Sequence, residues 1–153
     1  MPIRILVVDD HSVVRQGIIT LLEDEEDLII AGEASDGDEV WDMVEKVKPD
    51  VILLDLTMPR MPGLEVIKQI VPVFPSAKIL VFSMHNNTDY MLSSALSGAS
   101  GYLEKDTSRD EMLRAIRAIA SMPSTMAHRN SSPRAPCNCS HVASAAHRVG
   151  AVG

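Results

Sequence analysis

Charged and hydroxyl side chains follow short apolar runs at four points along the chain. These are Asp9 and Asp10 after the run 3–8, Asp55 after 51–54, Ser83 after 79–82, and Lys105 after a weaker run at 102–103. Three carboxylates that meet in a fold repel one another unless a cation neutralises them, and oxygen ligands without Cys or His suit Mg²⁺. An ammonium and a hydroxyl beside them would bind an anion such as phosphate. These residue types would therefore form a magnesium site that also holds a phosphoryl group.

The elements around these residues predict that they meet. Helical apolar stripes separate the runs, including Val40, Trp41, Val44 and Val47, or Met91, Leu92, Ala95 and Leu96. A further stripe follows the capping box formed by Ser108 and Glu111. Alternating strands and helices with near-continuous apolar strands predict an α/β protein with a parallel sheet covered on both faces. We expect a flavodoxin-like, doubly wound (βα)5 fold with strand order 2-1-3-4-5, in which the strands' carboxyl ends share one edge.

Composition limits the function classes. The 153 residues are 46% hydrophobic and 23% charged, which is typical of one soluble domain. A formal net charge of −7 argues against non-specific nucleic-acid or anionic-membrane binding by the whole chain. None of the apolar runs approaches the length of a membrane span or a signal-peptide core. We therefore expect a cytoplasmic protein that does not insert into a membrane.

The composition changes near residue 122. All 21 acidic residues lie in 1–122, whereas 123–153 has no acidic residue, no Leu or Ile and no aromatic residue. Such a segment buries too little apolar surface to offset the entropy of ordering, so we expect 1–122 to be the domain and 123–153 to be a disordered tail. Cys137 and Cys139 lie in this tail, and one Cys-x-Cys there is a weak zinc signal.

Four motifs carry a resemblance to a known family. They are LVVDDH at 6–11, LLDLTMP at 53–59, FSMH at 82–85 and GYLEKD at 101–106. In this order they resemble the receiver domain of bacterial two-component response regulators, over about residues 3–120. The details VVDDHSVVRQGI and GASGYLEKDTS resemble the NarL/FixJ subfamily, whose members usually continue into a LuxR-type helix-turn-helix.

The resemblance implies a role for each matching residue. Asp55 would accept a phosphoryl group from a phosphohistidine of a sensor histidine kinase, and Lys105 and Ser83 would contact that group. Mg²⁺ would be held by Asp9, Asp10, Asp55 and the main-chain carbonyl of Thr57. Tyr102 would move together with Ser83 when the receiver switches. The receiver would accept phosphate and lose it slowly, and would not be a conventional enzyme.

The resemblance also implies a conformational switch. The charge of the phosphoryl group would shift the loops 57–63 and 84–89, favouring one of two pre-existing states. A homodimer would be favoured on phosphorylation. The parent protein would be a DNA-binding transcription regulator, with DNA contacted only through an output domain that we expect to be absent from this chain.

The sequence departs from the family pattern at one site residue. Many receivers have Pro after the lysine, but Asp106 follows Lys105 here. Whether the Lys105–Asp106 peptide is cis is left open, because a cis bond without proline costs about 2.5–4 kcal/mol. His11 and His85 lie near the hard carboxylates, and we expect them to shape loops rather than to bind a metal.

Three alternatives stay open. A stand-alone receiver would act as a phosphate sink or as a partner-binding module. A haloacid-dehalogenase-type phosphatase would place Asp-x-Asp after its first strand, whereas Asp55 follows the third run and Thr57 stands two positions later. A flavodoxin-like cofactor binder would need a Ser/Thr/Gly-rich loop after the first strand, where this chain has the acidic DDHS.

Overall fold

The computed structural model describes residues 2–84 and 88–123. The predictions for His85, for part of the loop 84–89 and for nearly all of the 123–153 tail, including Cys137 and Cys139, therefore lie outside the described residues. Within the described ranges, no helix is long and apolar enough to cross a membrane. No peptide bond between described residues is cis, so the Lys105–Asp106 bond is trans.

Five parallel strands form one sheet in the order β2-β1-β3-β4-β5, as predicted. The strands are β1 (Ile3–Val8), β2 (Leu28–Ala34), β3 (Val51–Leu54), β4 (Lys78–Ser83) and β5 (Gly101–Glu104). Between and after them lie α1 (Ser12–Leu22), the short 3-10 helix η1 (Gly37–Glu39), α2 (Val40–Val47), α3 (Gly63–Ile70), α4 (Thr88–Ser97) and α5 (Arg109–Ala120). The flavodoxin-like α/β prediction is confirmed.

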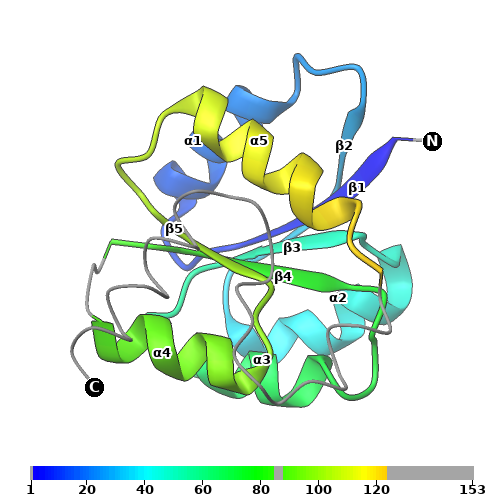
Figure 1. Ribbon diagram of the computed structural model, residues 1–153. Helices are drawn as coiled ribbons and strands as arrows, with labels where there is room; N and C mark the ends of the chain where they lie inside the picture. The colour runs from blue at the N-terminus through cyan, green and yellow to red at the C-terminus, as the bar shows by residue number, and fades with distance from the viewer. Residues whose placement is uncertain (1, 85–87, 124–153) are drawn as a thin grey trace.

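The sheet is the middle of three layers. Helices α1 and α5 cover one face, and α2, α3 and α4 cover the other (Figure 1). Strand β1 shows why both faces are apolar, because Ile5 and Val7 contribute to the core under α1 and α5, whereas Leu6 and Val8 contribute to the opposite core. All four side chains are buried, as expected for a central parallel strand. This burial fixes the register that brings the strand ends together.

Some elements extend beyond the predicted runs. The apolar run at 28–31 predicts a shorter second strand. Strand β2 continues to Ala34 because its backbone pairs with β1 as far as Val8, although Glu33 is exposed. Strand β4 begins at Lys78, and β5 extends the weak run to four residues. Hydrogen bonding to neighbouring strands, which apolar patterning does not report, accounts for these added residues.

The predicted apolar stripe of α4 is only partly buried. Leu92 and Leu96 are exposed, and the buried residue of this helix is Ser94. Ser94 fits because its hydroxyl donates to the Met91 carbonyl at 2.9 Å, which satisfies a polar group that would otherwise be unpaired. The predicted capping residue of α5 is confirmed, since the Ser108 hydroxyl accepts a hydrogen bond from the Glu111 amide at 3.2 Å.

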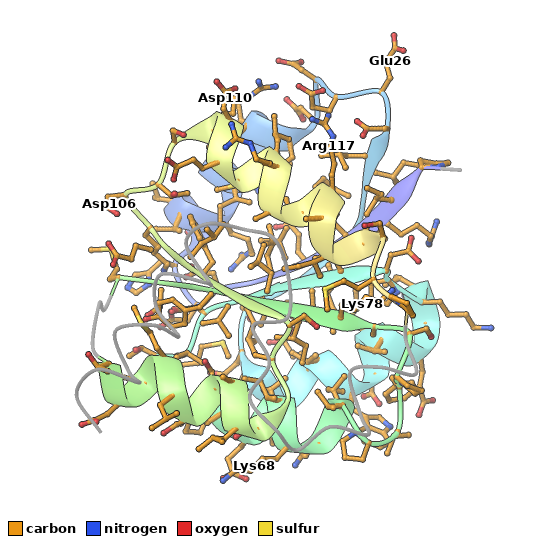
Figure 2. All side chains as sticks on the ribbon, viewed as in Figure 1. Glu26, Lys68, Lys78, Asp106, Asp110 and Arg117 are labelled. Atoms are coloured by element: carbon orange, nitrogen blue, oxygen red, sulfur yellow. The ribbon has the colours of Figure 1, made fainter. Side chains whose placement is uncertain are left out.

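The amino and carboxyl ends of the strands lie at opposite edges of the sheet. Figure 2 shows Asp106, just after β5, and Lys78, the first residue of β4, on opposite sides of the molecule. The strands run from the side of Lys78 to the side of Asp106, so the residues that follow the strands gather at the second edge. This edge carries the predicted site.

Candidate functional site

The backbone positions the site residues by continuing the sheet's hydrogen bonds beyond the strand ends. The Asp9 amide donates to the Ala34 carbonyl at 3.1 Å, and the Asp55 amide donates to the Val8 carbonyl at 3.0 Å. The Lys105 amide donates to the Ser83 carbonyl at 2.9 Å. Because these bonds link neighbouring strands, residues far apart in sequence are held side by side at the carboxyl edge.

A lysine bridges two of the acids. The Lys105 Nζ atom lies 2.7 Å from Asp9 Oδ2 and 3.6 Å from Asp55 Oδ2. The three side chains are 8%, 2% and 4% exposed, so this is a buried charge cluster. One ammonium faces two carboxylates, which leaves the cluster net negative before Asp10 is counted.

The acidic group has the composition of a divalent cation site. Ligand atoms of Asp9, Asp10, His11 and Asp55 all lie within 4.8 Å of one another. Asp10 Oδ1 is buried and accepts no hydrogen bond. His11 Nδ1 lies 3.0 Å from this oxygen, which is an ion-pair distance, but the two atoms do not form a hydrogen bond. An unsatisfied buried carboxylate oxygen beside two further carboxylates fits a hard cation such as Mg²⁺.

The loop after β3 contributes one contact to the site. The Thr57 amide donates to Asp55 Oδ1 at 3.3 Å, which keeps the backbone of the loop close to the carboxylate. Thr57 itself is exposed. The role of its carbonyl as a metal ligand stays a prediction.

The surroundings of Asp55 disfavour its charged form. Burial raises the pKa of the Asp55 carboxyl, the positive charge of Lys105 opposes that shift, and the negative charge of Asp9 adds to it. The net direction is upward, so Lys105 alone does not neutralise the site. A divalent cation would supply the missing positive charge.

Ser83 and Tyr102 form a second, polar contact in the same region. Both are buried, at 0% and 5% exposed, and their side chains are hydrogen-bonded to each other. Burial raises the pKa of the Tyr102 hydroxyl, and the hydrogen bond with Ser83 opposes this shift. The predicted pair is therefore in direct contact, with Tyr102 packed into the core under α2, α3 and α4.

Comparison with known families decides the identity of this fold and site. Residues 5–117 match the response regulator receiver domain family. The chain belongs to this family. The predicted resemblance is thus confirmed over nearly all of the described residues.

Individual relatives agree with this assignment of a receiver domain. The chain is 38% identical over 119 residues to the nitrate/nitrite response regulator protein NarL of Escherichia coli (strain K12), covering 78% of this chain and 55% of that protein. It is 35% identical over 118 residues to the transcriptional regulatory protein DegU of Brevibacillus brevis, covering 77% and 50%. The chain thus spans about half the length of the curated relatives it matches.

Solved structures of receivers have the same fold. A LuxR-family response regulator from Aurantimonas sp. SI85-9A1 aligns with a TM-score of 0.75 at 35% identity, covering 79% of this chain and 86% of that one. The isolated receiver domain of RcsB from Salmonella enterica serovar Typhimurium, solved in the presence of the phosphomimetic BeF3⁻, aligns with a TM-score of 0.72 at 28% identity, covering 78% and 88%.

Sequence reasoning missed one residue that supports the receiver's acidic pair. Arg15 Nη1 donates to the main-chain carbonyl of Asp9 at 2.6 Å, and Arg15 Nε pairs with Glu33 Oε1 at 3.0 Å. This arginine therefore ties α1 and the end of β2 to the backbone between Asp9 and Asp10. Its position one helical turn after His11 was the available signal, because that spacing directs a long side chain back toward the first turn.

Asp36 was also missed. It is 2% exposed and accepts hydrogen bonds from the amides of Met61 at 2.8 Å, Arg60 at 3.1 Å and Gly37 at 2.7 Å. Burial alone would raise the pKa of Asp36, but these backbone donors outweigh it and lower the pKa below its ordinary value. A Cβ at Gly37 would lie 2.4 Å from the Met61 carbonyl oxygen, so the close approach requires glycine. Asp36 thus fixes the far end of the loop that starts at Thr57.

Proposed function

We propose that this receiver takes a phosphoryl group from a phosphohistidine of a sensor histidine kinase onto Asp55, with Mg²⁺ as cofactor. One observation carries the proposal: Asp55 is a buried carboxylate with a raised pKa, between the ammonium of Lys105 and the acids at positions 9 and 10. A purely structural ion pair would balance its charges, whereas this cluster has more carboxylates than ammonium groups. A divalent cation would bind to the excess carboxylates, and a phosphoryl group would be attached to one of them.

The reaction is a displacement at phosphorus. An oxygen of the Asp55 carboxylate forms the new O–P bond while the N–P bond of the phosphohistidine breaks, and the kinase imidazole leaves with the electron pair of that bond. Bound Mg²⁺ would neutralise the charge on the equatorial phosphoryl oxygens. Asp10, Asp55 and the Thr57 carbonyl would hold the metal, with Asp9 beside it. Lys105 would donate to a phosphoryl oxygen and Ser83 to another.

The switch would use the contact between Ser83 and Tyr102. If the Ser83 hydroxyl turns to a phosphoryl oxygen, its hydrogen bond with Tyr102 must be remade or lost, and the tyrosine side chain can then change position. The added charge on Asp55 supplies the differential interaction that a population shift requires. The RcsB receiver, solved with the phosphomimetic BeF3⁻, supports a phosphorylated state of this kind.

Partners and output follow from the relatives. We propose a homodimer on phosphorylation, a cytoplasmic location, and a receiver domain at 1–122 whose output in a longer parent protein would be DNA binding. The relatives named transcriptional regulatory proteins, about twice the length of the matched region, favour this over a stand-alone phosphate sink. As a receiver, the chain would accept and slowly lose phosphate rather than turn over a separate substrate.

The experiment is incubation with a small-molecule phosphodonor, with and without Mg²⁺, followed by intact mass. We expect one added phosphoryl group that requires Mg²⁺ and is absent in Asp55→Asn. Asp24→Asn is the matched control, because Asp24 is an exposed acid outside the site. Labelling that persists in Asp55→Asn would overturn the proposal.

A further inference from the structure

Asp36 is a buried acid that the proposed phosphoryl transfer does not use. It lies two residues after β2 and is 2% exposed. Its Oδ1 atom accepts hydrogen bonds from the Gly37 amide at 2.7 Å and the Met61 amide at 2.8 Å. Its Oδ2 atom accepts from the Arg60 amide at 3.1 Å. Burial of a carboxylate is costly unless it is hydrogen-bonded, and two of the donors that satisfy Asp36 belong to the loop that follows the phosphoacceptor.

The loop 57–62 connects the phosphoacceptor to α3, and its two ends are joined. The Gly63 amide donates to the Leu56 carbonyl at 3.0 Å. A Cβ atom at Gly63 would lie 2.7 Å from the main-chain oxygen of Asp55, so the first residue of α3 lies directly against the backbone of the phosphoacceptor. The base of the loop is therefore fixed relative to Asp55.

The middle of the loop is held by the core and by Asp36. Met58 is buried in the core under α2, α3 and α4. Pro59 and Pro62 have no amide hydrogen to donate, and each has a restricted φ angle. The two amides between these prolines both donate to the Asp36 carboxylate. Asp36 thus fixes the far half of the loop from a different segment of the chain.

Thr57 lies between the base of this loop and its middle. The Thr57 amide donates to Asp55 Oδ1 at 3.3 Å, which is long for a hydrogen bond, and Thr57 is exposed. These contacts restrain Thr57 only weakly. The direction of its main-chain carbonyl therefore depends on how the rest of the loop is held.

We propose that Asp36 is a positioning residue for phosphoryl transfer to Asp55, because its hold on the loop keeps the main chain of Thr57 turned toward the acidic site. The inference rests on the proposed function, in which the Thr57 carbonyl helps to hold Mg²⁺. Without the Asp36 carboxylate, the loop would populate conformations in which this carbonyl does not face the cation.

The consequence is a split between metal affinity and reaction rate. The apparent dissociation constant of a ligand rises as the fraction of binding-competent protein falls, so loss of Asp36 would weaken Mg²⁺ binding. Saturating Mg²⁺ would draw the loop back into the competent conformation, so the phosphorylation rate at saturation would change little. A residue that only stabilised the fold would not produce this split.

The test compares three variants of the full chain. Asp36→Ala removes the acceptor of all three amides, whereas Asp36→Asn retains an Oδ1 atom that accepts from Gly37 and Met61. Ile119→Val is the destabilised control, because Ile119 is fully buried in the core under α1 and α5, on the other face of the sheet from Met58.

The first measurement is isothermal titration calorimetry with MgCl₂. The dissociation constant should rise about tenfold in Asp36→Ala, as for other residues that support a metal ligand. It should rise less in Asp36→Asn and stay at the wild-type value in Ile119→Val. The initial rate of labelling by a small-molecule phosphodonor at saturating MgCl₂ should stay within about twofold of wild type in all three variants.

The second measurement reports on the loop without a metal. Hydrogen exchange of the Thr57 amide, followed by nuclear magnetic resonance in EDTA, should be faster in Asp36→Ala than in wild type or Ile119→Val. A purely local role of Asp36 would speed exchange at Arg60 and Met61 and leave Thr57 unchanged.

The outcomes separate this inference from the proposed function. Folded Asp36→Ala with wild-type Mg²⁺ affinity and wild-type exchange at Thr57 would overturn the positioning role and leave phosphorylation of Asp55 standing. An equal loss of affinity in Ile119→Val would also overturn it. If Asp36→Ala does not fold, wild-type affinity in Asp36→Asn is the contradicting result. A wild-type chain that neither binds Mg²⁺ nor accepts a phosphoryl group would overturn the proposed function itself, and this inference with it.

Discussion

Lys105 Nζ lies closer to Asp9 Oδ2, at 2.7 Å, than to Asp55 Oδ2, at 3.6 Å. The ammonium thus forms its short contact with the acid next to the proposed metal, and a longer one with the phosphoacceptor. A phosphoryl group on Asp55 would add charge of about −1.5 to −2 on that side. We therefore expect Lys105 to turn from Asp9 toward position 55 on phosphorylation, with Mg²⁺ balancing the acids that it leaves.

Removal of the lysine should destabilise the metal-free domain. Lys105→Met leaves buried carboxylates without their cation, and breaking a buried ion pair in this way costs about 3–5 kcal/mol. Urea unfolding in EDTA measures the loss, and added Mg²⁺ should restore part of it. Lys46→Met, on the exposed last turn of α2, is the control and should change the free energy of unfolding by less than about 0.5 kcal/mol. Equal losses in the two variants would contradict a buried charge cluster.

Replacement of the phosphoacceptor should stabilise the metal-free domain at neutral pH. The pKa of Asp55 is raised above its ordinary value of 3.8, so the folded state binds a proton more readily than the unfolded state. Stability from this group is therefore lost as pH rises from the ordinary pKa through the raised one. Asn has no carboxyl group to ionise, so Asp55→Asn does not lose this stability. The variant should have a higher melting temperature than wild type at pH 7 in EDTA.

The pH profile provides the control for that prediction. The difference between Asp55→Asn and wild type should shrink as pH falls through the raised pKa of the folded state, and should be lost below the ordinary pKa of 3.8, where Asp55 is protonated in both states. Thermal melts over this pH range give the comparison. A difference that is independent of pH would mean that packing, rather than charge, separates the two proteins.

Magnesium should stabilise the wild-type fold. A ligand that binds only the folded state at 100 times its dissociation constant adds about 2.7 kcal/mol. Asp10→Asn removes the negative charge of the carboxylate whose Oδ1 atom accepts no hydrogen bond. The variant should therefore lose most of the stabilisation by magnesium. Chemical denaturation at rising MgCl₂ concentration, with NaCl at matched ionic strength as the control, measures the effect. Equal stabilisation by NaCl and MgCl₂ would indicate screening instead of binding.

Asp36 should matter more for stability than its exposed neighbour. Asp36→Ala removes the acceptor of three backbone amides, and leaving buried donors unsatisfied costs about 1–3 kcal/mol. Asp38→Ala removes only an exposed pair with Arg60 at 3.3 Å, worth about 0–1 kcal/mol. Urea unfolding of both variants tests the difference. If Asp38→Ala were the more damaging, the loop would be held by surface charge rather than by Asp36.

The sequence was sufficient to predict the location of those site residues whose position depends only on the topology of the sheet. Asp9, Asp55, Ser83 and Lys105 follow strands of one parallel sheet, so their meeting at one edge depends only on strand order. Apolar patterning predicted a parallel sheet through its alternation with helices, and the number of expected strands favoured the order 2-1-3-4-5. The sheet, the capping residue of α5 and the family were therefore predictable.

Contacts made through the backbone were not predictable in the same way. From the sequence, Asp36 is typical of a surface acid before a turn, because two of its three partners are main-chain amides about 24 positions away, whose location depends on the shape of the loop. The contact of Arg15 was hard to predict for the same reason, because its partner is a main-chain atom, the carbonyl oxygen of Asp9. The apolar stripe of α4 predicted more burial than the structure has, and Leu96 is 63% exposed. Hydrophobic periodicity identifies the apolar face of a helix, but it does not indicate how much of that face the sheet covers.

The central claim is that Asp55 accepts the phosphoryl group, and its most direct test is to identify the residue that is modified. The protein is phosphorylated with a small-molecule phosphodonor and Mg²⁺, the acyl phosphate is reduced with borohydride, and peptides are sequenced by mass spectrometry. Reduction converts an aspartyl phosphate to homoserine, so the account predicts homoserine at position 55 and unchanged aspartate at positions 9 and 10. Homoserine at another position, with Asp55 intact, would contradict it.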